Sequence, residues 1–427
     1  MANEPRARPL GAGLQGLALL LATGACAPGT ADLPEPLTLA EEDGSHPTVA
    51  VDAASGTAYV AWVGSRSGGE EWNVYLARLE EEGRLEGPVR VNEEPGDAAP
   101  HEQAPAQVRV APDGAVYVVW QTSRHIPGRH FPASDLRFAR SNDGGRTFGP
   151  TLSVNDNAGQ DPASHTFHDL AVGPDGTIYV SWIDGRRRGR EEARRTGEEV
   201  SVEEGDPLPD LEIRIARSED GGRSFGPSTV VDENPCPCCR TALAVGQDGQ
   251  VHLAWRKVYE GDIRDIVVAR SNDGGKSFTA PVRVAEDDWS IAGCPHAGPS
   301  LALDGSGRLH VAWYTGKTDE PGVYHTVSLA GAEGFSPPTP LLTDDWVPPA
   351  RVALASGPRG EVWAAWEDGR REPGWIDVAR INVGSSPSPV AELRERRPGR
   401  YPALVLGEQG PVLAWLEGEG VRLRPAR

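Results

Sequence analysis

The chain has 427 residues and a formal net charge of −20. A protein this acidic is repelled by nucleic acid and by anionic lipid surfaces, so its charge excludes both as partners. Glycine (51 residues) and proline (38 residues) are abundant and methionine occurs once. This composition is typical of many short strands joined by turns rather than of a helical protein.

The first 25 residues have the pattern of a signal peptide. Two arginines precede an apolar run over residues 10–25 that ends in small residues and is too short for a membrane span. The sequence LATGAC at its end resembles a bacterial lipobox, although Thr23 stands where that pattern has a larger aliphatic residue. We therefore expect a signal peptide over residues 1–25, lipidation of Cys26 and a tether over residues 26–35. The resemblance implies an exported outer-membrane lipoprotein, in the periplasm or at the cell surface, that contacts the membrane by its anchor only.

A short strand that ends in tryptophan recurs seven times in the rest of the chain. The copies are GTAYVAW, GAVYVVW, GTIYVSW, GQVHLAW, GRLHVAW, GEVWAAW and GPVLAW, which end at Trp62, Trp120, Trp182, Trp255, Trp313, Trp366 and Trp415. The intervals between these tryptophans are 58, 62, 73, 58, 53 and 49 residues. A unit that recurs at this period predicts a propeller or solenoid, because each unit buries its apolar face only against its neighbours.

Each unit is predicted to hold four strands, here called A to D, with strand B ending at the tryptophan. After Trp415 only GVRLRPAR (residues 420–427) remains for a further strand, so the last unit lacks its fourth. The segment PLTLAEED at residues 36–43 resembles the D strand PVRVAED at residues 281–287. We therefore expect the N-terminal strand to complete the last blade and to close an all-β, seven-bladed propeller over residues 36–427. A six-bladed propeller is the alternative if the seventh repeat packs irregularly.

Three copies of an eight-residue motif lie between predicted strands C and D. They read SNDGGRTF, SEDGGRSF and SNDGGKSF, with central aspartates Asp143, Asp220 and Asp273. These copies resemble the Asp-box, or BNR repeat, of the sialidase-like propellers, and the resemblance covers the whole predicted propeller. The aspartates are predicted to accept hydrogen bonds from turn amides, while the glycines supply positive φ. In that family these turns lie on the face opposite the active site, so the resemblance implies a structural role.

The loops that lead from strand D into the next strand A enter the innermost strands, so we expect them to ring the central channel. Two consecutive loops of this kind carry CPCCR and CPH. Four thiolates and an imidazole suit copper(I) or zinc. The candidate metal ligands are Cys236, Cys238, Cys239, Cys294 and His296. The alternative is a set of disulfides among these cysteines, which pair by default in an exported protein.

The resemblance also implies a candidate catalytic set. Sialidases bind the substrate carboxylate with three arginines and use a tyrosine nucleophile backed by a glutamate, with an aspartate as acid and base. The residues that match in part are Arg240, Arg351, Arg400 and Tyr401. The family's arginine-bearing motif opens its first blade, whereas here Arg400-Tyr401-Pro402 opens the last and His46 stands in the first. No tyrosine–glutamate pair can be assigned from the sequence.

Three functions follow from these patterns. The first is an extracytoplasmic, lipid-anchored binding protein with a ligand or metal site at the channel mouth. The second is an exo-α-sialidase-type glycoside hydrolase, and the third is a protein-interaction scaffold stapled by disulfides. The corresponding partners are a small anionic ligand, a glycan or another protein, and we expect the chain to be a monomer.

Overall fold

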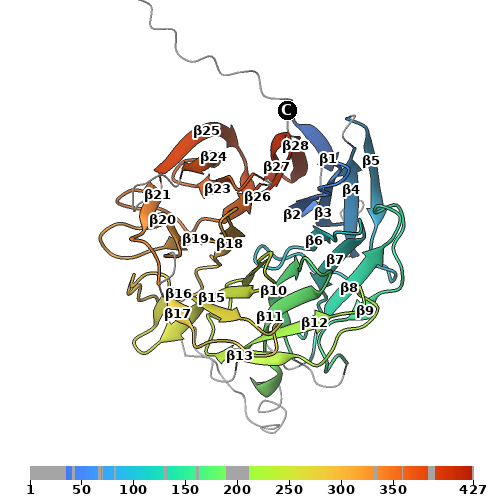
Figure 1. The fold of residues 1–427 in the computed structure, drawn as a ribbon, viewed down its shortest axis with the longest axis horizontal. Coiled ribbons are helices and arrows are strands. Elements are labelled where there is room, and N and C mark those ends of the chain that lie inside the picture. Colours follow the sequence, from blue (N-terminus) through green and yellow to red (C-terminus); the bar gives the residue numbers. More distant parts are fainter. Residues whose placement is uncertain are drawn as a thin grey trace, which may run out of the picture. The chain divides into compact units, whose positions relative to one another are not determined.

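The computed structural model describes residues 35–40, 44–65, 69, 71–80, 83–127, 132–159, 163–188, 211–329, 334–357, 359–382 and 390–425. The signal peptide, Cys26 and residues 26–34 of the expected tether lie outside the described residues. Within the described residues the fold is an all-β propeller whose seven four-stranded blades form a ring (Figure 1). Seven blades are therefore confirmed. The six-bladed alternative is wrong, because the seventh repeat forms a complete antiparallel sheet.

The strands of each blade follow one another from the channel outward. Blade 1 holds β2 (Gly44–Val51), β3 (Ala58–Ser65), β4 (Trp72–Leu79) and β5 (Leu85–Arg90). Blade 2 holds β6 (Gln107–Val110), β7 (Val116–Gln121), β8 (Leu136–Ser141) and β9 (Leu152–Ser153). Blade 3 holds β10 (His165–Val172), β11 (Ile178–Asp184), β12 (Glu212–Ser218) and β13 (Thr229–Glu233). Blade 4 holds β14 (Ala242–Val245), β15 (Val251–Tyr259), β16 (Ile263–Ser271) and β17 (Val282–Arg283).

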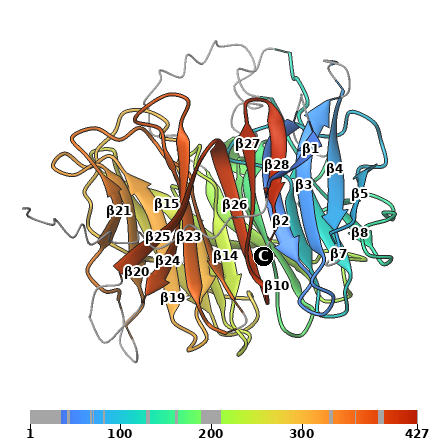
Figure 2. The same ribbon diagram turned by 90° about the horizontal axis from the view of Figure 1, so that it is seen from above.

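The remaining blades repeat this order. Blade 5 holds β18 (Ser300–Leu303), β19 (Leu309–Thr315), β20 (Gly322–Val327) and β21 (Thr339–Thr343). Blade 6 holds β22 (Val352–Ser356), β23 (Val362–Asp368), β24 (Trp375–Asn382) and β25 (Val390–Pro398). Blade 7 holds β26 (Arg400–Gly407), β27 (Gly410–Glu417), β28 (Gly420–Arg424) and β1 (Leu37–Ala40). The first strands of neighbouring blades contact one another around the ring. Figure 2 shows the ring from the side, with the connecting loops gathered at its two faces.

The repeated tryptophans fill the interfaces between blades. All seven side chains are buried, with exposed fractions of 0–4%. Each belongs to a separate apolar cluster that also includes residues of the preceding blade. Trp255 of blade 4, for example, packs with Ile183 and Ile215 of blade 3. The sequence repeat therefore corresponds to one apolar wedge for each interface, which explains why a single unit has no core of its own.

The closing strand pairs as the sequence predicts. In β1, Leu37 lies opposite Leu423, Thr38 opposite Arg422 and Ala40 opposite Val421, all antiparallel. Leu39 is buried in the cluster between blades 7 and 1. This pairing joins the two ends of the propeller in one sheet and covers the edge that β28 would otherwise expose.

The turns that contain Asp143, Asp220 and Asp273 share one hydrogen-bond pattern. The Oδ1 atom of Asp143 accepts bonds from the backbone N–H groups of Arg146 (3.0 Å) and Thr147 (2.9 Å). Asp220 and Asp273 accept the same pair of bonds in blades 3 and 4. Hydrogen bonds led by that from Ser224 hold the pKa of Asp220 well below its usual range. These carboxylates are engaged by their own turns.

Among the described residues, no helix is long and apolar enough to cross a membrane.

We predict that a disulfide forms between cysteines placed at positions 38 and 422. Directly opposed residues of an antiparallel pair lie about 4.5–5.5 Å apart by Cα, within the range that a disulfide spans. The variant T38C/R422C should run faster on a non-reducing gel and unfold at a higher temperature, with a gain on the order of a few kcal/mol. In the control T38C/V421C the two side chains point to opposite faces of the sheet. Equal cross-linking of the two variants would contradict the register.

Candidate functional site

The loops that enter the first strands of the blades meet around the central channel. A cavity of about 120 Å³ lies there. Its charged lining residues are Arg109, Asp169, Arg240 and Arg351, and prolines and backbone of the first strands complete it. Asp169 pairs with Arg109 at 3.2 Å and accepts a bond from the backbone N–H of Leu243 at 2.8 Å. The cavity therefore has an excess of positive charge.

Three cysteines of the CPCCR loop form a buried thiol cluster. The loop joins β13 to β14, and the backbone N–H of Cys236 donates to the carbonyl of Arg256 at 2.7 Å. The Cys236 sulfur lies 3.8 Å from that of Cys238 and 3.3 Å from that of Cys239. All three thiols are free and are packed among the apolar residues between blades 3 and 4. Burial raises the pKa of the Cys239 thiol to about 12.

The CPH loop brings two more donors to the same place. It joins β17 to β18, and its cysteine, Cys294, is free and exposed. The ligating atoms of Cys238, Cys294 and His296 lie within 4.8 Å of one another, as do the sulfurs of Cys236, Cys238 and Cys239. The structure thus places the five predicted ligands in two groups of three that share Cys238.

Two buried arginines of blade 4 support this cluster, and the sequence did not assign either of them to it. Arg264 of β16 lies 3.5 Å from the Cys236 sulfur and donates to the carbonyl of Gly293 at 2.5 Å, so it bridges the two loops. Arg256 of β15 is 1% exposed and donates to the carbonyl of Ala297 at 3.0 Å. In the sequence these arginines look like ordinary strand residues, and only their burial distinguishes them.

A line of charged contacts leads from the thiols into the channel mouth. Hydrogen bonds with Cys238 and then His296 lower the pKa of Cys294 to about 5. The interaction of His296 with Cys294, followed by its interaction with Glu102, raises the pKa of His296 to about 10. The Nδ1 atom of His296 lies 2.9 Å from Glu102 Oε1, and this ion pair with His296 holds the pKa of Glu102 at about 2. At neutral pH the metal-free site therefore holds a thiolate, an imidazolium and a carboxylate in a row.

The same glutamate contacts Tyr401 from the other side. The Tyr401 hydroxyl donates to Glu102 Oε2 at 3.1 Å, across 299 positions of sequence. The Tyr401 ring lies 4.2 Å from that of His46, and the Arg351 guanidinium lies 5.6 Å from its centroid. Burial, followed by the charge of Glu102, raises the pKa of Tyr401 to about 12. A tyrosine–glutamate pair is therefore present, although the sequence did not reveal it.

The three candidate arginines do not lie together. Arg240 and Arg351 both line the channel cavity. Burial and then the charge of Arg240 lower the pKa of Arg351 to about 9, and its Nη2 atom has no hydrogen-bond partner among the described residues. Arg400 is exposed and pairs with Glu372 at 3.1 Å, outside the cavity lining. The third arginine that lines the cavity is Arg109, which the sequence analysis did not predict.

The backbone is strained at the same face. Among the described residues, seven residues other than glycine have positive φ. Three of them, His46, Phe167 and Tyr401, lie at register shifts near the start of a first strand, and three more, Asn234, Asp288 and His296, lie in the loops that lead into blades 4 and 5. Positive φ costs free energy for residues with a side chain, and such strain clusters at binding and catalytic sites. The strain is therefore one observation that supports the channel mouth as the candidate site.

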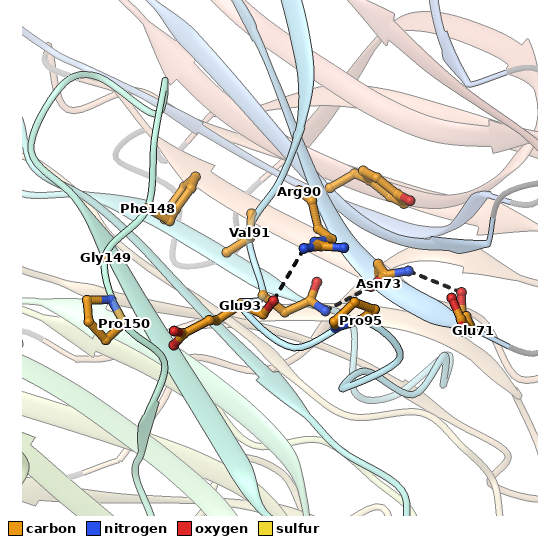
Figure 3. Close-up of a pocket in the computed structure, with 11 residues that line it drawn as sticks. Glu71, Asn73, Arg90, Val91, Glu93, Pro95, Phe148, Gly149 and Pro150 are labelled. Atoms are coloured by element: carbon orange, nitrogen blue, oxygen red, sulfur yellow. Dashed lines mark hydrogen bonds between the residues drawn. The ribbon is translucent and has the colours of Figure 1, made fainter.

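A larger pocket lies at the side of the ring, between blades 1 and 2. It has a volume of about 770 Å³ and is lined by Arg90, Glu93 and Phe148 among others (Figure 3). Its two asparagines hold each other, since Asn92 Nδ2 donates to Asn73 Oδ1 at 2.9 Å, and Asn92 also donates to the carbonyl of Glu94. These amides therefore serve the loop that follows β5, and the channel mouth remains the stronger candidate site.

Comparison with known proteins identifies the fold. Neither a protein-family model nor a curated protein matches the chain. A polysaccharide lyase of family PL25, an ulvan lyase bound to -[GlcA(1-4)Rha3S]-, is 11% identical with a TM-score of 0.58, over 91% of this chain and 95% of that one. The polysaccharide lyase Uly1 is 10% identical with a TM-score of 0.53, over 92% and 98%. A leech intramolecular trans-sialidase is 12% identical with a TM-score of 0.49, over 89% of both chains. At these identities the likeness concerns the fold alone.

We predict that Cys294 of the reduced, metal-free protein is reactive well below the usual pH of a thiol. Because its pKa is lowered from 9.0 to about 5, the thiolate predominates above pH 5 and the alkylation rate should be constant between about pH 6 and 9. In H296A, which removes one hydrogen-bond partner, the midpoint should rise by about one unit or more. H125A, which changes an exposed histidine that belongs to neither ligand group, should keep the wild-type profile. A wild-type rate that still rises between pH 7 and 9 would contradict the assignment.

Proposed function

We propose that this chain is an extracytoplasmic, lipid-anchored binding protein that holds a soft metal ion, copper(I) or zinc, at the mouth of its propeller channel. The anchor is inferred from the lipobox-like segment before Cys26. The observation that carries the metal site is the convergence of four free thiols and one imidazole in two groups whose ligating atoms lie within 4.8 Å. Such a donor set suits copper(I) or zinc.

The spacing of the sulfurs supports this proposal. Sulfurs that share one tetrahedral ion at about 2.3 Å stand about 3.8 Å apart. The contacts of Cys236 with Cys238 and Cys239, at 3.8 and 3.3 Å, are close to that value. Thiols packed among apolar residues gain little from one another as neutral groups, whereas as thiolates around a cation they are all satisfied.

The surroundings of His296 support it as well. Its Nδ1 atom faces Glu102, which would leave Nε2 as the nitrogen that binds the metal. A carboxylate on the other ring nitrogen is the usual partner of a metal-binding histidine and orients its ring. Glu102 would thus hold His296 in place rather than bind the ion.

Metal analysis of the exported protein, purified without reductant or chelator, tests the proposal. We expect at least one copper or zinc ion per chain and four thiols once the metal is removed. E102Q should weaken metal binding by about 10–100-fold, the usual loss for a residue that positions a ligand, whereas H125A should not change it. Two disulfides and no metal would contradict the proposal and favour the disulfide-stapled scaffold.

A second candidate is an exo-α-sialidase-type glycoside hydrolase, and one observation favours it. Tyr401 and Glu102 form a hydrogen-bonded pair beside Arg351, whose buried Nη2 has no partner among the described residues. An anionic substrate group would satisfy that guanidinium. The ulvan lyase that shares the fold was solved with a glucuronate-containing saccharide, and an acidic glycan would likewise suit this channel.

Turnover of a fluorogenic sialoside separates this candidate from a binding protein. If the chain is a hydrolase, Y401F should lower kcat by at least about 10²-fold, since it removes the group that reacts with the substrate. The same substitution should leave metal content unchanged, because Tyr401 belongs to neither ligand group. Absence of turnover by the wild-type protein would remove the hydrolase, and turnover that survives in Y401F would remove Tyr401 as its nucleophile.

A further inference from the structure

The two ligand groups differ in their access to solvent. Cys236, Cys238 and Cys239 are buried, with exposed fractions of 0–4%. Cys294 is exposed and the His296 side chain is 37% exposed, so these two face the channel mouth. Only Cys238 belongs to both groups. The site therefore has an inner, closed half and an outer, open half that meet at one sulfur.

One ion cannot use all five donors. Zinc in protein sites takes four ligands, and the ligating atoms of the inner and outer groups do not all lie within 4.8 Å of one another. An ion centred among the three inner sulfurs would leave Cys294 and His296 without a metal. An ion bound by the outer pair and Cys238 would leave Cys236 and Cys239 as buried thiols. A thiolate that bridges two ions resolves the conflict, because both groups then have three ligands each.

The number of donors in each group, rather than the charge of the surroundings, indicates which ions fit. Metal-bound cysteines are thiolates, so four of them bring four negative charges into a largely buried place. The cations at hand are Arg264, 3.5 Å from the Cys236 sulfur, and Arg256, whose charge acts on Cys236 and Cys239. Glu102, 2.9 Å from His296, and Asp262, 3.9 Å from Arg264, add two carboxylates, so the charge balance does not select the ion. The number of donors favours copper(I), because each group has three ligands whereas a closed zinc site takes four.

Arg264 also explains how the two halves stay together. Its guanidinium donates to the carbonyl of Gly293, the residue before Cys294, while it contacts the Cys236 sulfur of the other loop. A change in one loop is therefore transmitted to the other through a single buried side chain. Arg264 of blade 4 therefore contacts both of the loops that carry the cysteines.

We propose that the site holds two copper(I) ions bridged by the Cys238 thiolate. Cys236 and Cys239 complete the inner ion, and Cys294 and His296 complete the outer one. Cys236, Cys238 and Cys239 release their thiol protons to solvent when they bind, the Cys294 thiolate binds as it is, and the His296 imidazolium releases the proton of the nitrogen that binds. The oxidation state of copper does not change. This inference rests on the proposed metal-binding function and adds to it the number of ions, their charge and the role of each ligand.

The test is an anaerobic titration of the reduced full-length protein with copper(I) alone, followed by desalting and metal analysis. We expect two copper ions per wild-type chain, with a copper–copper scattering path in the X-ray absorption spectrum. The variant C294S/H296A removes only exposed or half-exposed loop side chains and should keep one ion and lose that path. C238S should also lose the path, because it removes the bridge, and H125A should keep two ions.

The outcomes separate this inference from the function on which it rests. One ion per wild-type chain, or two ions still bound by C294S/H296A, would overturn the bridged pair while leaving a metal-binding protein. No copper bound by the reduced wild-type protein would overturn the bridged pair, and a parallel titration in which zinc is not bound either would overturn the proposed function as well. Circular dichroism of each variant shows whether the propeller remains folded, and the two loop substitutions lie outside the apolar interfaces.

Discussion

The structure depends on the packing of one tryptophan into each interface between blades. No blade has an apolar core of its own, because the face that its tryptophan covers belongs to the preceding blade. The ring therefore becomes stable as a whole, and its closed form removes every sheet edge at the seam between the first and last blades. The position of each channel loop follows from this packing, since each loop ends at a strand whose place in the ring is set by two interfaces.

This arrangement explains how the channel mouth assembles residues from distant parts of the chain. Glu102 enters from blade 2, His296 from the loop before blade 5 and Tyr401 from blade 7, yet all three are in contact through one carboxylate. Glu102 thus links the cysteine cluster to the tyrosine and to the arginine-lined cavity. Any change in the charge of His296, such as the loss of its proton, alters the carboxylate that accepts the hydrogen bond from Tyr401.

The sequence predicted the fold well because its signals are local. A strand that ends in tryptophan can be recognised from its own sequence, without knowledge of the strands it pairs with. The closing strand at residues 37–40 was predicted from its likeness to another strand of the same chain. The outer strands β9 and β17 are shorter than expected, at two residues each. In blade 2 the side chain of Asn155 accepts the N–H of Leu136 that a longer strand would have satisfied.

The candidate site could be predicted only where it depends on equivalent positions in successive repeats. CPCCR and CPH occupy such positions, and the structure brings their side chains together. The contacts of Glu102 with His296 and Tyr401 cross the channel, so they depend on the width of the channel. That width cannot be deduced from a local sequence pattern. Arg264 was missed because its strand does not reveal which way a buried guanidinium points. Arg400 lies apart from the channel, where it is exposed and pairs with Glu372.

The pairing of β1 with β28 has a consequence for the order of events during biosynthesis. Residues 37–40 leave the ribosome before every other strand, but their partner at residues 420–424 is made last. For most of synthesis the earliest strand has no neighbour, and the ring stays open until the final strand is available. Closure of the propeller ring therefore has to wait until β28 has been synthesised, however early the other blades form.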